Sequence, residues 1–376
     1  MVYLNYAAAD LGSEACVQAI TEHLRAEMQH GPYVAAQHAG ERLQQLYAQL
    51  AAILHCAPAD LALTTGNSHA WNSVVSAYPW QAGDQVVITS GEWGGNVAML
   101  SLLQQRLGIE VLMAPHHANG ALDLSALQQL LAQSPRVRML CLTWVPAHGA
   151  LVYPAQDIGA LCRQHGVAYV IDAAQAAGHL PVDVQKLQCD ALTAPGRKWL
   201  GGPRGTGVLY VHPRLRARLQ PSTVDHRSCP ITEHGLQLRS DMLAFEAAEH
   251  AVALRLGWHA ALQRRTNSDW AARYASIARQ GQALRTALRQ LPQMRLHDVD
   301  DSAAHCGIAS FSLGDLAAPH IQQALAAQGI QVAVHAPGFT PGDSARQLGS
   351  VVRVSVSEPT CESEMKALTQ QLAALA

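Results

Sequence analysis

Residues 167–171 read Val-Ala-Tyr-Val-Ile, a short apolar run that stops at Asp172. An uninterrupted run of this length is typical of a β-strand buried on both faces of a parallel sheet. Parallel strands need long crossover connections, and helical patterns separate most of the apolar runs along this chain. The other strands of this sheet are expected at residues 61–65, 86–90, 109–114, 137–143 and 206–211. The sequence therefore predicts an α/β fold on a mostly parallel, doubly wound sheet.

Capping residues mark the first helices. Ser13 is a typical N-cap and Gly31 a typical stop, so a helix is expected between them, to about His30. A second helix is expected over residues 36–56. Both precede the first strand, so they are expected to lie outside the alternating part of the fold.

The pattern changes after about residue 239, and 376 residues are too many for one compact core. Two domains are therefore expected. We predict an N-terminal segment (1–15) that packs on the small domain, a large domain (16–240) and a small C-terminal α+β domain (241–376). In the small domain, helices are expected at 241–264, 268–290, 318–328 and 361–375, and strands at 294–299, 307–313, 330–335 and 351–356.

Composition excludes several classes of protein. The formal net charge of -2 gives no reason to expect nucleic acid or an anionic membrane as a partner. No apolar run reaches the length of a membrane-spanning helix, and the N-terminus has no signal-peptide pattern. The eight cysteines are scattered without a C-x-x-C pair, which is typical of reduced thiols in a cytoplasmic protein. The histidines show no metal-ligand spacing, so no metal is expected.

Two polar residues mark a candidate site. Asp172 ends a buried strand, and Lys198 follows within a glycine-rich segment. Ligands of open α/β sheets bind beyond the carboxyl ends of the strands. A lysine that forms a Schiff base and an acid that partners a pyridinium nitrogen are what a pyridoxal phosphate site requires. Taken alone, the pair is also compatible with a surface lysine and an aspartate that caps a helix.

Longer motifs narrow this choice. The chain reads Asp-Ala-Ala-Gln at 172–175, Ala-Pro-Gly-Arg-Lys-Trp at 194–199, Gly-Gly-Pro-Arg-Gly-Thr-Gly at 201–207, Glu-Trp-Gly-Gly-Asn at 92–96 and Thr-Trp-Val-Pro-Ala-His-Gly at 143–149. In this combination the chain resembles the class V aminotransferase family of fold-type I pyridoxal phosphate enzymes. That family includes cysteine desulfurases, isopenicillin N epimerase-like proteins and the C–S lyases of ergothioneine synthesis. The motifs at 92–96 and 194–199 are most similar in sequence to those of the ergothioneine lyases.

The resemblance implies a role for each motif residue. It implies that Lys198 forms the Schiff base and then takes the Cα proton of the substrate, while Asp172 keeps the pyridine nitrogen protonated. Gln175 would hydrogen-bond the phenolic oxygen of the ring, or it would only pack between helix and strand. Arg353 would clamp the substrate carboxylate through a bidentate pair.

The resemblance also implies a phosphate site at the start of the helix after residue 65. Gly66, Asn67 and Ser68 would offer backbone N–H groups and one hydroxyl, with Asn67 contributing only its backbone. Arg197 would add a cation where many relatives carry histidine. Pro195 stands where those relatives often have a serine or threonine, so one phosphate hydroxyl is missing.

Two further positions have open roles. Trp93 aligns with the histidine that stacks on the cofactor in desulfurases, and an indole stacks there or serves as a core residue. His148 falls at the family's asparagine position, where it would donate to the ring oxygen or cap a turn.

The absence of one cysteine argues against a desulfurase reaction. Desulfurases carry a nucleophilic cysteine on the loop before the arginine strand, whereas residues 337–350 contain none here. Cys229 is interpreted as a surface thiol. The leading hypothesis is therefore a pyridoxal phosphate-dependent C–S lyase that acts on an amino acid by β-elimination from a cysteine S-conjugate or sulfoxide. Transamination and epimerisation share the steps up to the carbanion, and a non-enzymatic binding protein is the third alternative. The resemblance also implies a homodimer with its site at the subunit interface.

Overall fold

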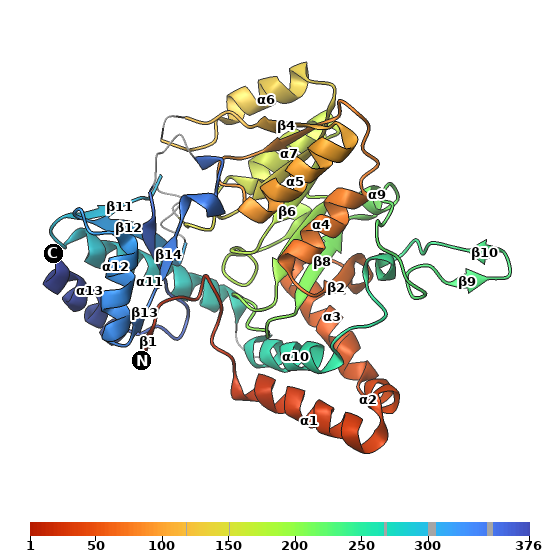
Figure 1. Cartoon of the computed structure of the whole chain (residues 1–376), viewed down its shortest axis with the longest axis horizontal. Coiled ribbons are helices and arrows are strands. Elements are labelled where there is room, and N and C mark those ends of the chain that lie inside the picture. The colour runs from red at the N-terminus through yellow and green to blue at the C-terminus, as the bar shows by residue number, and fades with distance from the viewer. Residues whose placement is uncertain (118, 150, 267–268, 300–305, 344–348) are drawn as a thin grey trace.

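The computed structural model describes residues 1–376 except 118, 150, 267–268, 300–305 and 344–348. A large sheet with helices packed around it forms one part of the molecule, and a smaller sheet with its own helices lies beside it (Figure 1). Both chain termini lie at the smaller part. Within the described residues, no helix has the length and apolar character needed to cross a membrane.

The large sheet has seven strands in the order β2-β8-β7-β6-β5-β3-β4. Strand β8 alone runs against its neighbours, so the sheet is mostly parallel, as predicted. The strands are β2 (Leu61–Thr64), β3 (Gln85–Ile88), β4 (Glu110–Met113), β5 (Val137–Thr143), β6 (Ala168–Asp172), β7 (Ala191–Pro195) and β8 (Gly207–Val211). The sequence did not predict β7, whose Ala-Leu-Thr-Ala-Pro stretch is short and poor in strand-forming side chains.

Side chains of the sheet alternate between two hydrophobic cores. In β6, Tyr169 and Ile171 belong to one core, whereas Ala168 and Val170 belong to the other. Burial on both faces explains why this strand is apolar without interruption. Asp172 ends the strand at the sheet edge where the connections to the following helices begin.

The helices described around the large sheet either precede its first strand, as the first three do, or lie between or follow its strands. They are α1 (Glu14–His30), α2 (Pro32–His38), α3 (Gly40–Leu54), α4 (Asn67–Ala77), α5 (Gly94–Leu107), α6 (Leu124–Gln133), α7 (Ala155–His165), α8 (Val184–Leu187), α9 (Pro213–Arg216) and α10 (Val252–Thr266). Ser13 caps α1 as predicted, since its side chain accepts from the Cys16 N–H at 3.2 Å. The single helix predicted over 36–56 is wrong, because the chain is helical from Pro32 and α2 ends at Ala39 before α3 starts.

A helix was predicted from residue 241, but α10 begins at Val252. Residues Met242–Phe245 form only a 3₁₀ turn, and Glu246 is extended. The Glu246 carboxylate accepts from the Leu63 N–H at 2.7 Å and from Arg255 Nη1 at 3.0 Å. These bonds hold the extended segment against β2, and the helix therefore begins later in the sequence than predicted.

The smaller part is built on a four-stranded antiparallel sheet in the order β11-β12-β15-β14. Its elements are α11 (Trp270–Arg289), β11 (Met294–Leu296), β12 (Ile308–Leu313), α12 (Ala318–Ala327), β13 (Ile330–Gln331), β14 (Ala333–His335), β15 (Val351–Ser355) and α13 (Glu362–Leu375). Strand β1 (Val2–Tyr3) pairs with β13, which attaches the N-terminus to this part. The hairpin of β9 (Ile231–Thr232) and β10 (Gly235–Leu236) projects from the opposite side (Figure 1).

Core composition suggests where the domains divide. The core of the small part includes Leu284 and Leu288 of α11, whereas Trp258 and Leu262 of α10 belong to a core of the large sheet. Helix α10 also packs against α1 and α3. We therefore propose that the small domain begins at α11 rather than at residue 241.

Candidate active site

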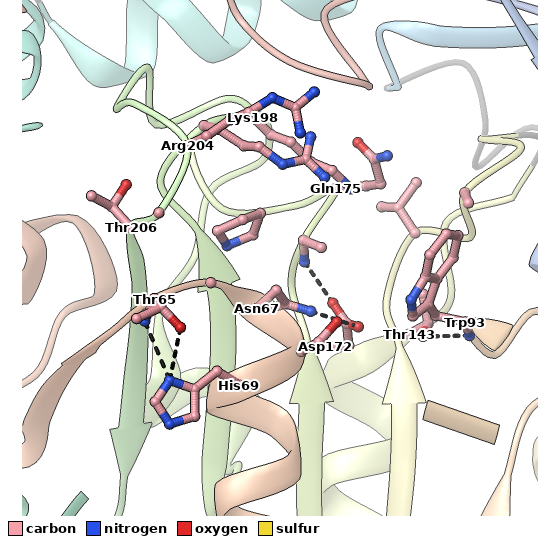
Figure 2. Close-up of a pocket in the computed structure, with 18 residues that line it drawn as sticks. Thr65, Asn67, His69, Trp93, Thr143, Asp172, Gln175, Lys198, Arg204 and Thr206 are labelled. Atoms are coloured by element: carbon pink, nitrogen blue, oxygen red, sulfur yellow. Dashed lines mark hydrogen bonds between the residues drawn. The ribbon is translucent and has the colours of Figure 1, made fainter. Parts of the chain in front are cut away.

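A cavity of about 430 Å³ lies at the edge of the large sheet where its parallel strands end. Connections after β2, β3, β5, β6 and β7 and the segment before β8 converge there. Eight of the ten residues predicted for the site line this cavity, namely Gly66, Asn67, Ser68, Trp93, Asp172, Gln175, Arg197 and Lys198. In Figure 2, Asp172 and Asn67 lie near the strand ends and Lys198 lies on the opposite side of the cavity.

Three N–H donors hold the buried Asp172 carboxylate. The Ala174 N–H donates to Oδ1 at 2.9 Å, and Asn67 Nδ2 donates to Oδ2 at 2.9 Å (Figure 2). Asn96 Nδ2 also donates to Oδ2, at 3.0 Å. Burial raises the pKa of Asp172, and these donors and Lys198 oppose the shift. Asn67 was predicted to offer only its backbone to the phosphate, and the bond of its side chain to this carboxylate was not foreseen.

A second buried carboxylate supports the first. Glu92 is fully buried, and its Oε1 accepts from Asn96 Nδ2 and from the Thr143 hydroxyl, both at 2.7 Å. Its Oε2 accepts from the Thr143 N–H at 3.1 Å. Burial raises the pKa of Glu92 to about 7. The sequence motif 92–96 pointed to this segment, but the roles of Glu92 and Asn96 were missed.

The Lys198 side chain extends from the connection between β7 and β8. Desolvation by the surrounding protein, followed by the charge of Arg197, lowers the pKa of its amine to about 7, and Asp172 opposes this shift. A lysine with such a pKa has a large fraction of neutral amine near neutral pH. Neutral amine is the form that attacks a carbonyl carbon or accepts a proton.

The start of α4 forms one wall of the cavity. Its N-cap is Gly66, which offers no side-chain acceptor to the N–H groups of the first turn. Ser68 lines the cavity beside these groups. Free N–H groups and the helix dipole form a suitable site for a phosphate.

Gln175 and Trp93 are fixed by neighbours. Gln175 Nε2 donates to the Ala7 carbonyl at 2.9 Å, and Trp199 Nε1 donates to Gln175 Oε1 at 2.8 Å. The second N–H of Nε2 remains for a ligand, since an amide nitrogen carries two. Trp93 lines the cavity and stacks on Phe339, with ring centroids 5.5 Å apart and planes at 19°.

The two remaining predicted residues, His148 and Arg353, are not among the residues found to line the cavity. His148 Nε2 lies 3.3 Å from Asp343 Oδ2, and its ring packs edge-on against His335 of β14. Arg353 Nη1 donates at 2.8 Å to the carbonyl of Ala147, a cavity-lining residue. Arg353 Nε is buried without a hydrogen-bond partner in the described part of the chain. Desolvation, followed by Arg197, lowers the pKa of Arg353 to about 10.

The loop of residues 337–350, which precedes the strand of Arg353, lies partly outside the described residues. Residues Pro337–Phe339 form a short 3₁₀ helix that contacts the start of α5, and 344–348 are not described. No cysteine is among the residues found to line the cavity. Among the described residues, no cluster of three potential metal ligands is present.

The cavity fits pyridoxal phosphate. It has a buried carboxylate for the pyridinium nitrogen, a lysine of lowered pKa for the aldehyde, and an uncapped helix start for the phosphate. The fit rests on the chemistry of these donors and acceptors. Asp172, Lys198, Gln175 and the first turn of α4 are the groups that would hold the cofactor.

The comparisons with known proteins agree with this fit. The model of the family described as Aminotransferase class-V matches residues 2–368. The chain belongs to the aminotransferase class-V family. It is therefore an enzyme of a family that uses pyridoxal phosphate.

Similar proteins include some that are named as lyases and others that are named as cysteine desulfurases. A probable hercynylcysteine sulfoxide lyase of Mycobacterium tuberculosis is 31% identical over 84% of this chain and 76% of its own length. A cysteine desulfurase of Yersinia pestis is 28% identical over 95% of this chain and 89% of its own. A solved complex of the cystine C–S lyase C-DES with cysteine persulfide has 26% identity and a TM-score of 0.89, and covers 99% of this chain and 97% of its own. Another C-DES structure carries glycine covalently linked to pyridoxal phosphate.

Proposed function

We propose that this class-V enzyme is a C–S lyase that cleaves the Cβ–S bond of a cysteine S-conjugate or sulfoxide by β-elimination. One observation carries the proposal: Lys198 faces a cavity without a cysteine among the residues found to line it, and residues 337–350 contain none in the sequence. Transfer of sulfur to the enzyme needs such a thiol as acceptor. Elimination needs only a base near the Cα proton.

The residues of the cavity suit each step of an elimination. When bound, pyridoxal phosphate supplies an electron sink for the charge that develops at Cα. Arg353 holds the α-carboxylate, since its buried Nε has no hydrogen-bond partner among the described residues and its neighbour Ala147 lines the cavity. Lys198 accepts the Cα proton, because its lowered pKa leaves a large fraction of its amine neutral near pH 7. The Asp172 carboxylate, fixed by its N–H donors, would pair with the protonated ring nitrogen.

The overall reaction balances without an oxidant or reductant. The Cα–H bond and the Cβ–S bond break, and sulfur leaves with the electron pair of the Cβ–S bond. The remaining aminoacrylate takes up one water molecule and becomes pyruvate and ammonium. Each turnover therefore yields one thiol, or one sulfenic acid from a sulfoxide, with one pyruvate and one ammonium.

The test is to incubate the purified holoenzyme with a set of cysteine S-conjugates and sulfoxides and to measure pyruvate. Wild type is expected to form pyruvate from at least one of them, and Lys198→Ala is expected to form none above background. Pyruvate from no conjugate would refute the elimination. If an amino donor alone converts the cofactor to its amine form, seen as a shift of the visible absorbance, the enzyme is an aminotransferase instead.

We also propose that the enzyme acts as a homodimer. Helix α1 exposes Val17, Leu24 and Met28 on one face, and Tyr33 and Val34 of α2 continue this apolar surface. A second copy is the proposed partner, because the small net charge of -2 gives little repulsion between copies. Sedimentation should show a dimer for wild type and a smaller species for the double variant Met28→Glu, Tyr33→Glu. A wild-type monomer would contradict the proposal.

A further inference from the structure

Three arginines gather around the cavity without a carboxylate partner. Arg197 donates to the Ala8 carbonyl, and Arg353 donates to the Ala147 carbonyl. Arg204 lines the cavity and has no hydrogen bond or ion pair within the described part of the chain. The Asp172 carboxylate is bonded to amide and backbone N–H groups and contacts none of the three.

Buried arginines elsewhere in the described chain are paired differently. Arg255 lies 3.0 Å from Glu246, Arg273 lies 2.8 Å from Glu358, and Arg285 lies 3.0 Å from Asp298. Such pairing is expected, because a guanidinium removed from water needs an anion to offset the loss of hydration. The protein supplies that anion at these three sites but not for Arg197 and Arg353, which are only partly exposed, whereas Arg204 is exposed to solvent beside them.

The cavity arginines also act on one another. The pKa of Arg197 is lowered by burial and then by the charge of Arg204. The pKa of Arg353 is lowered by burial and then by the charge of Arg197. Three cations beside one cavity give it a positive potential that favours anionic ligands.

The expected ligands supply two anionic groups, whereas three arginines lie beside the cavity. The cofactor brings a phosphate, for which Arg197 and the start of α4 are available. The substrate brings its α-carboxylate, for which Arg353 is available. Arg204 remains, and it extends over the cavity from the same loop as Lys198, on the side opposite Asp172 (Figure 2).

We propose that Arg204 binds a second anionic group, carried on the sulfur substituent of the substrate, so that the enzyme prefers cysteine conjugates with an acidic substituent. This inference rests on the proposed C–S lyase function. The chemistry recognised is an oxyanion such as a carboxylate, held by a guanidinium that has no other partner in the described residues.

Two nearly isosteric probes test it. S-carboxymethylcysteine carries a second carboxylate, and S-carbamoylmethylcysteine carries a neutral amide in its place. Wild type, Arg204→Gln and the remote exposed control Arg295→Gln on β11 are compared with both probes as holoenzymes. Taking the ratio of kcat/KM between variant and wild type for each probe cancels the difference in leaving-group reactivity.

Arg204→Gln is expected to lower kcat/KM for the carboxymethyl conjugate by about tenfold, the lower end for a charge-assisted hydrogen bond, because Arg204 is exposed to solvent. For the carbamoylmethyl conjugate the change should stay within about twofold. The Arg295→Gln control should leave both values unchanged. Equal losses for the two conjugates in Arg204→Gln would overturn the inference.

Two further arms separate the other outcomes. Cofactor retained on dilution, followed by its visible absorbance, should be the same in wild type and Arg204→Gln. Loss of cofactor in the variant would assign Arg204 to the cofactor phosphate and overturn the inference. If wild type forms no pyruvate from either probe, the proposed lyase reaction does not occur with these two conjugates. The role of Arg204 is then tested by measuring how tightly each probe binds. Dissociation constants from tryptophan fluorescence should then favour the carboxymethyl probe in wild type but not in the variant, and equal preference in both would overturn the inference.

Discussion

Asn96 is the residue through which the two buried carboxylates of the site are connected, and its replacement by alanine tests this part of the account. The single nitrogen Nδ2 donates to Glu92 Oε1 at 2.7 Å and to Asp172 Oδ2 at 3.0 Å. Asn96→Ala removes both donors and leaves both carboxylates buried. The variant is therefore expected to destabilise the protein and to disturb the carboxylate that faces the cofactor.

The size of the effect follows from the bonds that remain. A hydrogen bond to a charged acceptor contributes about 1.5–3 kcal/mol, so two such bonds set an upper range of about 3–6 kcal/mol. Glu92 keeps both donors of Thr143, and Asp172 keeps Asn67 and Ala174. Because neither carboxylate loses all its partners, the expected loss lies at the lower end, about 3 kcal/mol.

The assay is urea unfolding of wild type, Asn96→Ala and the control Asn72→Ala, at constant cofactor concentration because bound ligand adds to stability. Asn72 lies on α4, and no hydrogen bond from its side chain to the described residues is found. The control should change the unfolding free energy by less than about 1 kcal/mol. A loss in Asn96→Ala no larger than in the control would refute the reasoning, since both buried bonds would then be without consequence.

Three further results are expected. Burial raises the pKa of Glu92 in the folded protein from 4.5 to about 7, so the folded protein binds this proton more tightly than the unfolded chain does. The contribution of Glu92 to stability therefore falls as the pH rises from about 4.5 to 7. The thermal midpoint of Glu92→Gln should fall less than that of wild type over this pH range, and parallel plots of midpoint against pH would contradict the shift. Arg353→Gln should raise KM for all amino-acid substrates about tenfold or more, measured by initial rates, and an unchanged KM would remove Arg353 from carboxylate binding. Phe339→Ala removes the ring stacked on Trp93, so quenching of the cofactor fluorescence by the indole should weaken. Circular dichroism should show that the fold is retained. Identical quenching in wild type and variant would show that Phe339 does not position Trp93.

The large sheet was predictable because burial on both faces leaves a direct record in sequence. Residues 168–172 are apolar up to Asp172, and the structure places the strand there. Strand β7 was missed because its hydrogen bonds to β6 and β8, and not its own side chains, make it a strand. The division between α2 and α3 at Ala39 was missed although Gly40, a residue of low helix propensity, follows it directly.

The site was predictable as a set of motifs and less so as a set of contacts. Asp172, Lys198 and the residues 66–68 meet in one cavity, as expected from strand ends that share an edge. The bonds of Asn67 and Asn96 to Asp172 depend on side-chain direction across separate helices, which residue spacing does not encode. His148 contacts Asp343 and His335, which lie far from it in the sequence, so no local pattern predicts these contacts.

The most direct test of the central claim is the product balance of the holoenzyme with a cysteine S-conjugate that it accepts. Pyruvate, ammonium and thiol should appear in equal amounts, without alanine, and all three should be absent with Lys198→Ala. Alanine together with enzyme-bound persulfide sulfur, or equal pyruvate formation by Lys198→Ala, would contradict a lyase that works through Lys198.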